Sequence, residues 1–177
     1  MSQRSLAGFT IVEALVATAV FALAMTAIVG VFLAVLRVNE RARQVRLVEQ
    51  NARYITEFIS REIRNGRIDY DAYGGAIPNP TNTLRLVDKD GNSASFQFSN
   101  GDVTYTRAGQ TSQLDSQGIN IGNFRFFIAP VVDPFGVSPG LIEQPMVTLV
   151  LEISSENSRD PATMIVQTTV STRFYPR

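Results

Sequence analysis

The chain has 177 residues and contains neither cysteine nor histidine. Without cysteine it has no disulfide framework and no thiolate nucleophile. The absence of both residue types also excludes a typical zinc site and a histidine-based catalytic triad. No other group of residues in the sequence predicts a catalytic centre. We therefore expect a protein that is not an enzyme and that needs no cofactor or metal.

The chain also lacks an excess of charge of either sign, since 16 Lys and Arg residues balance 16 Asp and Glu residues. Bulk charge therefore favours neither nucleic acid nor an anionic surface as a partner. After Gly66 the basic residues are scattered among acidic ones, with no run of basic and aromatic residues that would stack on single strands. The sequence disfavours nucleic-acid binding.

One acidic pattern resembles a metal site. Asp88, Asp90 and Asn92 alternate like the first ligands of a calcium loop. Gly91 comes too early for such a loop, and no glutamate follows at the required spacing. The pattern is more typical of a hairpin turn than of a calcium site.

No proline occurs before Pro78, and no charged residue occurs from Ala14 to Leu36. As a helix this uncharged stretch would be roughly 35 Å long, which exceeds the roughly 30 Å of a bilayer's hydrocarbon core. Glu13 stands directly before it, within otherwise apolar sequence. A carboxylate in a membrane needs a cation beside it. Cleavage after Gly8 would supply one, because the new amino group of Phe9 would lie one helical turn from Glu13.

The segment Gly8-Phe9-Thr10-Ile11-Val12-Glu13, followed by a long apolar helix, resembles the class III signal of type IV pilins and pseudopilins. The resemblance implies that a prepilin peptidase cuts between Gly8 and Phe9 on the cytoplasmic side of the membrane and N-methylates Phe9. It also implies that Glu13 forms a salt bridge with such an amine during filament assembly. The run from Asn51 to Asp69 further resembles the PilW- and PulJ-like minor subunits.

The resemblance implies a structural role in a type IV pilus (fimbrium) or a type II secretion pseudopilus. The chain would consist of a leader peptide (1–8), the transmembrane half of a helix (9–36), its amphipathic half (37–66) and a β head domain (67–177). It would first sit in the cytoplasmic membrane with its head outside, and then in a cell-surface or periplasmic filament. The implied partners are other pilin or pseudopilin subunits, the prepilin peptidase and an inner-membrane assembly platform.

Beyond the apolar stretch, the helical period continues and predicts one helix from Phe9 to Asn65. Its apolar stripe comprises Val45, Val48, Ala52, Ile55, Ile59 and Ile63. Gly66 follows the expected end, and glycine readily takes a left-handed conformation there. The stripe needs an apolar cover.

After Gly66 the apolar period changes to two, which predicts strands. The expected strands are a three-stranded meander around Leu84, Phe96 and Val103, followed by longer strands over 124–132, 146–154 and 164–174. We therefore predict an α+β fold, in which the long N-terminal helix packs on an antiparallel β-sheet head. Residues 69–83 and 133–145, which are rich in glycine and proline, are expected to be surface loops that carry recognition.

Three alternatives remain open. A secretory signal peptide would be cut near Ala22-Leu23-Ala24, although the apolar run continues beyond that point. A simple signal anchor would leave Glu13 at the interface, and the chain would then be a single-pass membrane-anchored adhesin or sensor with no assembly role. Finally, the basic residues Arg37, Arg41, Arg43 and Arg46 follow the apolar stretch, so the positive-inside rule favours the opposite orientation to the one that the resemblance implies.

Overall fold

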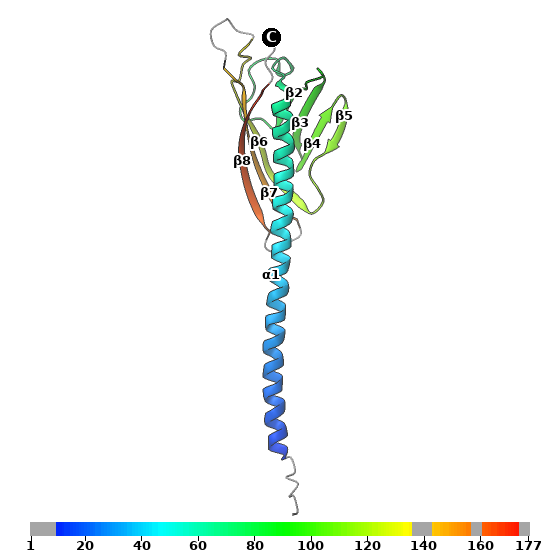
Figure 1. Ribbon diagram of the computed structural model, residues 1–177, viewed down its shortest axis with the longest axis vertical. Coiled ribbons are helices and arrows are strands. Elements are labelled where there is room, and N and C mark those ends of the chain that lie inside the picture. The colour runs from blue at the N-terminus through cyan, green and yellow to red at the C-terminus, as the bar shows by residue number, and fades with distance from the viewer. Residues whose placement is uncertain (1–9, 136–142, 157–160, 174–177) are drawn as a thin grey trace, which may run out of the picture. The chain divides into compact units, whose positions relative to one another are not determined.

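The computed structural model describes residues 10–135, 143–156 and 161–173 (Figure 1). It contains the α-helix α1 (Ile11–Asn65), the 3-10 helix η1 (Asp71–Tyr73) and the strands β1 (Arg67–Ile68), β2 (Thr83–Val87), β3 (Ser93–Ser99), β4 (Asp102–Arg107), β5 (Gln110–Gln113), β6 (Ile119–Ala129), β7 (Met146–Ser155) and β8 (Thr163–Ser171). The predicted α+β fold, with the N-terminal helix packed on antiparallel strands, is confirmed.

The chain divides into two compact units between Ala42 and Arg43. The first unit holds the N-terminal part of α1. The second unit, which we call the head, holds the rest of α1 and all the strands.

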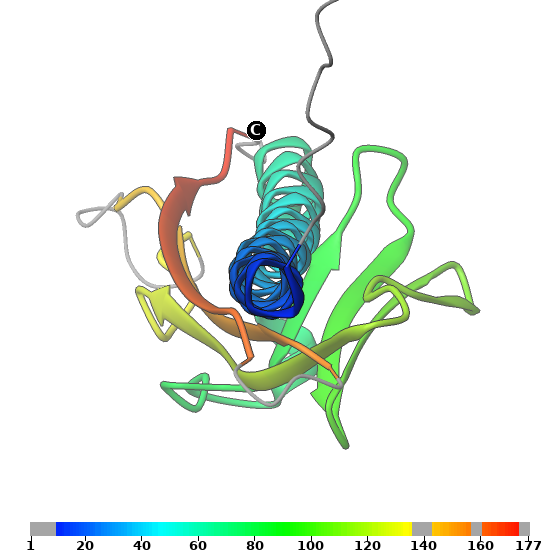
Figure 2. The same ribbon diagram turned by 90° about the horizontal axis from the view of Figure 1, so that it is seen from below.

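Within the head, α1 buries the predicted stripe against the sheets. Its buried side chains are Val48, Ala52, Ile55, Ile59, Ser60 and Ile63. The stripe begins one turn later than expected, because Val45 is exposed. In Figure 2 the strands β2 to β5 lie on one side of this part of α1, and β8 lies on the other. The apolar cover that the stripe needs is therefore provided from two sides.

The strands form two antiparallel sheets. One has five strands in the order β1-β2-β3-β4-β5, and the other has three in the order β6-β7-β8. The predicted three-stranded meander is confirmed as β2, β3 and β4. Asn100 and Gly101 form its second turn, with Ser99 paired to Asp102. The sequence pattern missed β5, because all four of its residues are polar and exposed.

Gly66 ends α1 for a different reason from the one predicted. It is absent from the glycines with positive φ, so it does not adopt the left-handed conformation. A Cβ atom at this position would lie 2.9 Å from the carbonyl oxygen of Val87 and 3.1 Å from that of Glu62. Glycine is needed here because the chain passes close to β2 as it leaves the helix.

Residues 69–83 are not simply a surface loop, because Thr81 also pairs with the outer edge of β6 at Phe126. Thr81 exchanges two backbone hydrogen bonds with Phe126, at 2.9 and 2.8 Å, and the Ile77 amide donates to Val131 at 2.8 Å. Ile77 and Thr81 are buried. The prediction of a surface loop is therefore wrong for this part of the segment, because its backbone pairs with a strand edge.

Candidate functional sites

The most extensive candidate binding surface among the described residues is the exposed apolar part of α1 in the first unit. Every residue of α1 from Ile11 to Arg41 is exposed. This part of the helix is long and apolar enough to cross a membrane, and none of its most apolar stretch is buried against other described residues. An apolar surface of this size is stable only when lipid or other protein covers it.

Glu13 lies in the first turn of α1, where Thr10 caps the helix. The Thr10 hydroxyl accepts a hydrogen bond from the Glu13 amide at 3.3 Å, and the Thr10 carbonyl accepts one from the Ala14 amide at 3.2 Å. Sequence reasoning missed this cap, although a threonine followed by a glutamate at the third position is the signature of a capping box. The cap sets the start of α1 at Ile11, two residues later than the predicted start at Phe9.

No ion pair of the Glu13 carboxylate is found among residues 10–135, 143–156 and 161–173. Gly8 and Phe9, the other two predicted site residues, lie outside the described residues. The cleavage and methylation site and the Glu13 salt bridge therefore stay predictions.

The first unit also carries a series of small residues that sequence reasoning missed. They recur at every fourth position and comprise Ala14, Thr18, Ala22, Thr26, Gly30 and Ala34. The hydroxyls of Thr18 and Thr26 donate to the carbonyls of Ala14 and Ala22, both at 2.8 Å, so they are satisfied within the helix. Small residues at this spacing let two helix backbones approach closely in a membrane.

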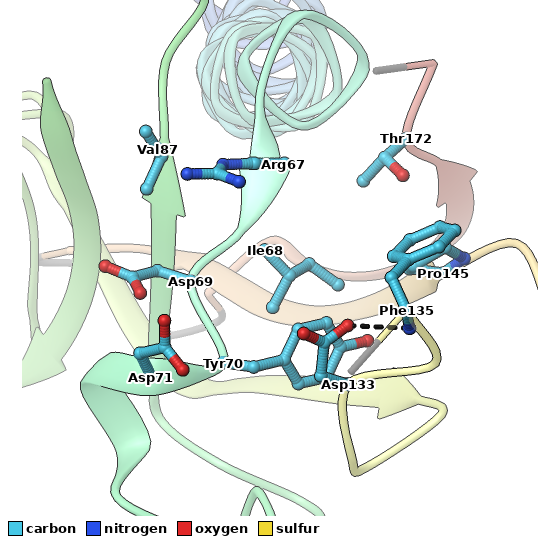
Figure 3. A pocket seen from close by; sticks show the side chains of 10 residues that line it. All are labelled: Arg67, Ile68, Asp69, Tyr70, Asp71, Val87, Asp133, Phe135, Pro145 and Thr172. Atoms are coloured by element: carbon cyan, nitrogen blue, oxygen red, sulfur yellow. Dashed lines mark hydrogen bonds between the residues drawn. The ribbon is translucent and has the colours of Figure 1, made fainter. Parts of the chain in front are cut away.

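In the head, the two segments that were expected to carry recognition meet at one small pocket of about 70 Å³ (Figure 3). Asp69, Tyr70 and Asp71 line it from the first segment, and Asp133, Phe135 and Pro145 line it from the second. The Asp133 carboxylate accepts a hydrogen bond from the Phe135 amide at 2.9 Å. The sequence had marked both segments but could not show that they are adjacent.

Tyr70 joins the first of these segments to the residue that directly follows β6. It is buried, and its hydroxyl donates to the carbonyl oxygen of Pro130 at 3.0 Å. Burial raises the pKa of Tyr70 to about 12, and the negative charges of Asp133 and Glu143 act in the same direction. The phenol therefore stays a neutral hydrogen-bond donor at physiological pH.

Residues 88–92 form the turn between β2 and β3, as predicted. The Asp88 carboxylate accepts from the amides of Asp90 and Asn92, both at 2.8 Å, and forms an ion pair with Arg107 at 2.6 Å. These contacts use the lone pairs that a cation would need. Within the part of the chain that the structure describes, no group of three or more acidic residues is arranged to hold a metal ion.

The structure thus offers two candidate functional surfaces. One is the exposed apolar part of α1 in the first unit, and the other is the pocket beside Tyr70 in the head. In comparisons with known proteins, no protein-family model, no curated protein and no solved structure matches this chain. The function has to follow from the residues themselves.

Proposed function

We propose that this chain is a structural minor subunit of a filament of the type IV pilus or type II secretion kind. In this proposal α1 anchors the chain in the cytoplasmic membrane until a prepilin peptidase removes residues 1–8 and methylates Phe9. The subunit then enters the filament near its tip, where α1 leaves lipid for contact with other subunits. The assembly platform supplies the energy.

The observation that carries the proposal is the position of Glu13. It stands at the start of a helix face that is exposed over about twenty further apolar residues and therefore needs lipid or protein around it. A carboxylate in such surroundings costs about 3 kcal/mol when it is unpaired at the membrane centre, and less near the interface. An amino terminus created one turn away, on this chain or on a neighbour, would remove that cost.

The small residues of α1 support the assembly step. A single-pass anchor that only touches lipid has no need of close helix contacts, and bulky apolar residues would serve it equally well. A Cβ atom at Gly30 would meet nothing within 4 Å, so no contact inside the described chain explains a glycine there. Contact with a helix of another subunit would explain it.

The test is co-expression with a prepilin peptidase, followed by intact mass spectrometry. We expect the mature chain to lack Met1 to Gly8 and to carry one additional methyl group. Gly8→Leu should block this mass change, whereas the control Gln3→Leu, within the leader but away from the cleavage point, should not. A chain that keeps its initiator methionine beside an active peptidase would contradict the proposal and favour a membrane-anchored adhesin or sensor.

A further inference from the structure

Within the part of the head that the structure describes, the outer edge of β8 is the longest strand edge without a backbone partner. The other sheet edges are shorter or interrupted, because β1 has two residues, β5 has four, and Thr81 pairs with Phe126 in the longer β6. β8 has nine residues and, among the described strands, pairs with β7 alone. Among the described residues, no backbone group of another element is hydrogen-bonded to its outer side.

The register shows which residues face that open side. The Ser155 amide donates to Ala162 at 2.9 Å, and the Thr172 amide donates to Pro145 at 3.2 Å. Hydrogen-bonded pairs alternate along an antiparallel ladder, so the even-numbered residues of β8 bond to β7. The backbone groups that point outward belong to Thr163, Ile165, Gln167, Thr169 and Ser171.

The sequence of this edge has none of the residues that usually prevent strand pairing. Residues 163–171 contain no charged residue, no proline and no glycine. Ile165 is 69% exposed. Proteins normally blunt such an edge with lysine, proline or a bulge, because its free backbone groups are a template for another chain. An unprotected edge of this length indicates that something pairs with it.

A groove of about 250 Å³ lies beside this edge, between β8 and α1. Met164 and Val166 line it from β8, and Ala52, Thr56 and Glu57 line it from α1. The Thr56 hydroxyl oxygen is buried and has no hydrogen-bond partner among the described residues. A strand added to β8 would lie along this groove.

The charges around the groove indicate what kind of strand fits. Glu49 is paired with Arg53 at 3.9 Å, whereas no ion pair is found for Glu57 among the described residues. One negative charge therefore remains at the groove. In a second copy of this chain, the described edge strands β8 and β5 carry no basic residue that could face Glu57.

We propose that the free edge of β8 binds an extended segment of a different polypeptide, which adds antiparallel to the three-stranded sheet. Alternate apolar side chains of that segment cover Met164 and Val166, and a lysine or arginine faces Glu57. This is recognition by strand addition, in which the backbone supplies affinity and the groove supplies specificity. It does not depend on cleavage of the leader or on filament assembly.

The first experiment uses the full chain in detergent micelles. The probe is an acetylated and amidated nine-residue peptide of alternating threonine and valine, with one lysine at the position that faces Glu57. Amide hydrogen exchange should slow at Ile165, Gln167 and Thr169 when the peptide is added. The even-numbered amides of β8 should be protected already. Unchanged exchange at the odd-numbered residues, for peptides with lysine at each inward position, would overturn the proposal.

Substitutions distinguish pairing at the edge from nonspecific binding. Gln167→Pro removes an outward amide without removing a β7 bond, so we expect about tenfold weaker binding with little change in melting temperature. Glu57→Gln should weaken binding of the lysine peptide severalfold. The matched control Glu49→Gln should not, because that carboxylate is already paired. Equal affinity of Gln167→Pro and the unaltered chain would contradict strand addition.

The natural occupant can be trapped by a photocrosslinking amino acid at position 167, introduced in the cells that normally make the protein. We expect crosslinks to one segment of another polypeptide that contains a basic residue and alternating apolar residues. Crosslinks to a second copy of this chain, to a helical segment, or to nothing would each overturn the proposal.

Discussion

The Tyr105 hydroxyl donates a hydrogen bond to the Glu62 carboxylate at 3.0 Å, and so joins β4 to α1. Tyr105 is 8% exposed and stacks on Phe96, with the ring of Phe58 at an edge. Burial raises the pKa of Tyr105 to about 12, and the hydrogen bond to Glu62 and its negative charge add to this effect.

Tyr105→Phe removes this hydrogen bond and leaves the Glu62 carboxylate without its donor. We expect the free energy of unfolding of the head to fall by about 1 to 3 kcal/mol, as for bonds to charged groups. Urea denaturation followed by circular dichroism measures it. Tyr54→Phe is the control, because Tyr54 is exposed and donates no hydrogen bond within the described residues. Equal losses in the two variants would contradict a specific role for Tyr105.

The same bond predicts a pH dependence at the alkaline end. The folded-state pKa of Tyr105 lies above the ordinary value of 10.0. The stability that the neutral Tyr105 side chain contributes to the folded head is therefore fully present below about pH 10 and is lost as the pH rises towards 12. The slope of stability against pH in this range should be smaller for Tyr105→Phe than for the unaltered chain. Part of the slope should remain, since the pKa of Tyr70 is raised as well.

Asp88→Asn is expected to destabilise the turn between β2 and β3. Burial raises the pKa of Asp88, but hydrogen bonds from the Asn92 amide, Arg107 and the Asp90 amide outweigh it and lower the pKa to about 2. The ordinary pKa of an aspartate is 3.8, so the stability that the ionised Asp88 side chain contributes to the folded head is present above about pH 4 and is lost as the pH falls towards 2.

Melting temperatures measured between pH 2 and 5 test this prediction. The unaltered head should lose stability on acidification more steeply than Asp88→Asn does. Asp90→Asn is the control, because Asp90 is 57% exposed and contacts Arg107 only at 3.3 Å. A control that matched Asp88→Asn at every pH would contradict a specific role for Asp88.

Gly66→Ala should destabilise the head, because the new methyl group would approach the Val87 and Glu62 carbonyl oxygens too closely. Backbone has to shift to make room, at a cost of about 1 to 3 kcal/mol. Gly75→Ala is a matched control, since a Cβ atom there meets nothing within 4 Å and the φ angle is not positive. Chemical denaturation should show a lower free energy of unfolding for Gly66→Ala than for Gly75→Ala.

Gly30→Leu tests the close helix contacts of the proposed filament. Alanine at this position should be tolerated, because it favours the helix by about 1 kcal/mol and stays small. Leucine should reduce the fraction of the chain recovered in sheared filaments severalfold, whereas Val31→Leu should not. Normal recovery of the Gly30→Leu variant would show that this position does not pack against another helix.

Glu13→Ala separates processing from assembly. We expect the leader to be removed almost normally, because the cleavage point lies five positions earlier. Incorporation into filaments should fall strongly, since the amino terminus of a neighbour would lose its counter-ion. Mass spectrometry measures the first step, and the protein content of purified filaments measures the second. A variant that enters filaments normally would count against the salt bridge.

Periodic patterns made most of the fold predictable. The spacing of Val48, Ala52 and Ile55 identified the buried face of α1, and the period of two identified the longer strands. β5 escaped detection because an exposed polar edge strand has no apolar alternation to reveal it. The division into two sheets was also missed, because which strands pair is decided by contacts between distant residues.

The candidate sites were predictable only in part. The sequence from Gly8 to Glu13 placed Glu13 directly before an apolar helix. The Thr10 cap could have been found from the same segment, because Thr10 and Glu13 have the spacing of a capping box. The pocket at Tyr70 could not be found, because Asp69 and Asp133 lie far apart in sequence and meet only through the fold. The open edge of β8 likewise depends on register, which no single strand reveals.

The burial of Ile55, Ile59 and Ile63 between the sheets has a practical consequence for protein production. A recombinant fragment that starts at Arg67 would retain every strand yet omit the side chains around which they pack. A truncation meant to yield a water-soluble sample should therefore start near Arg43, ahead of Val48. Such a fragment lacks the exposed apolar part of α1 and retains all of its buried residues.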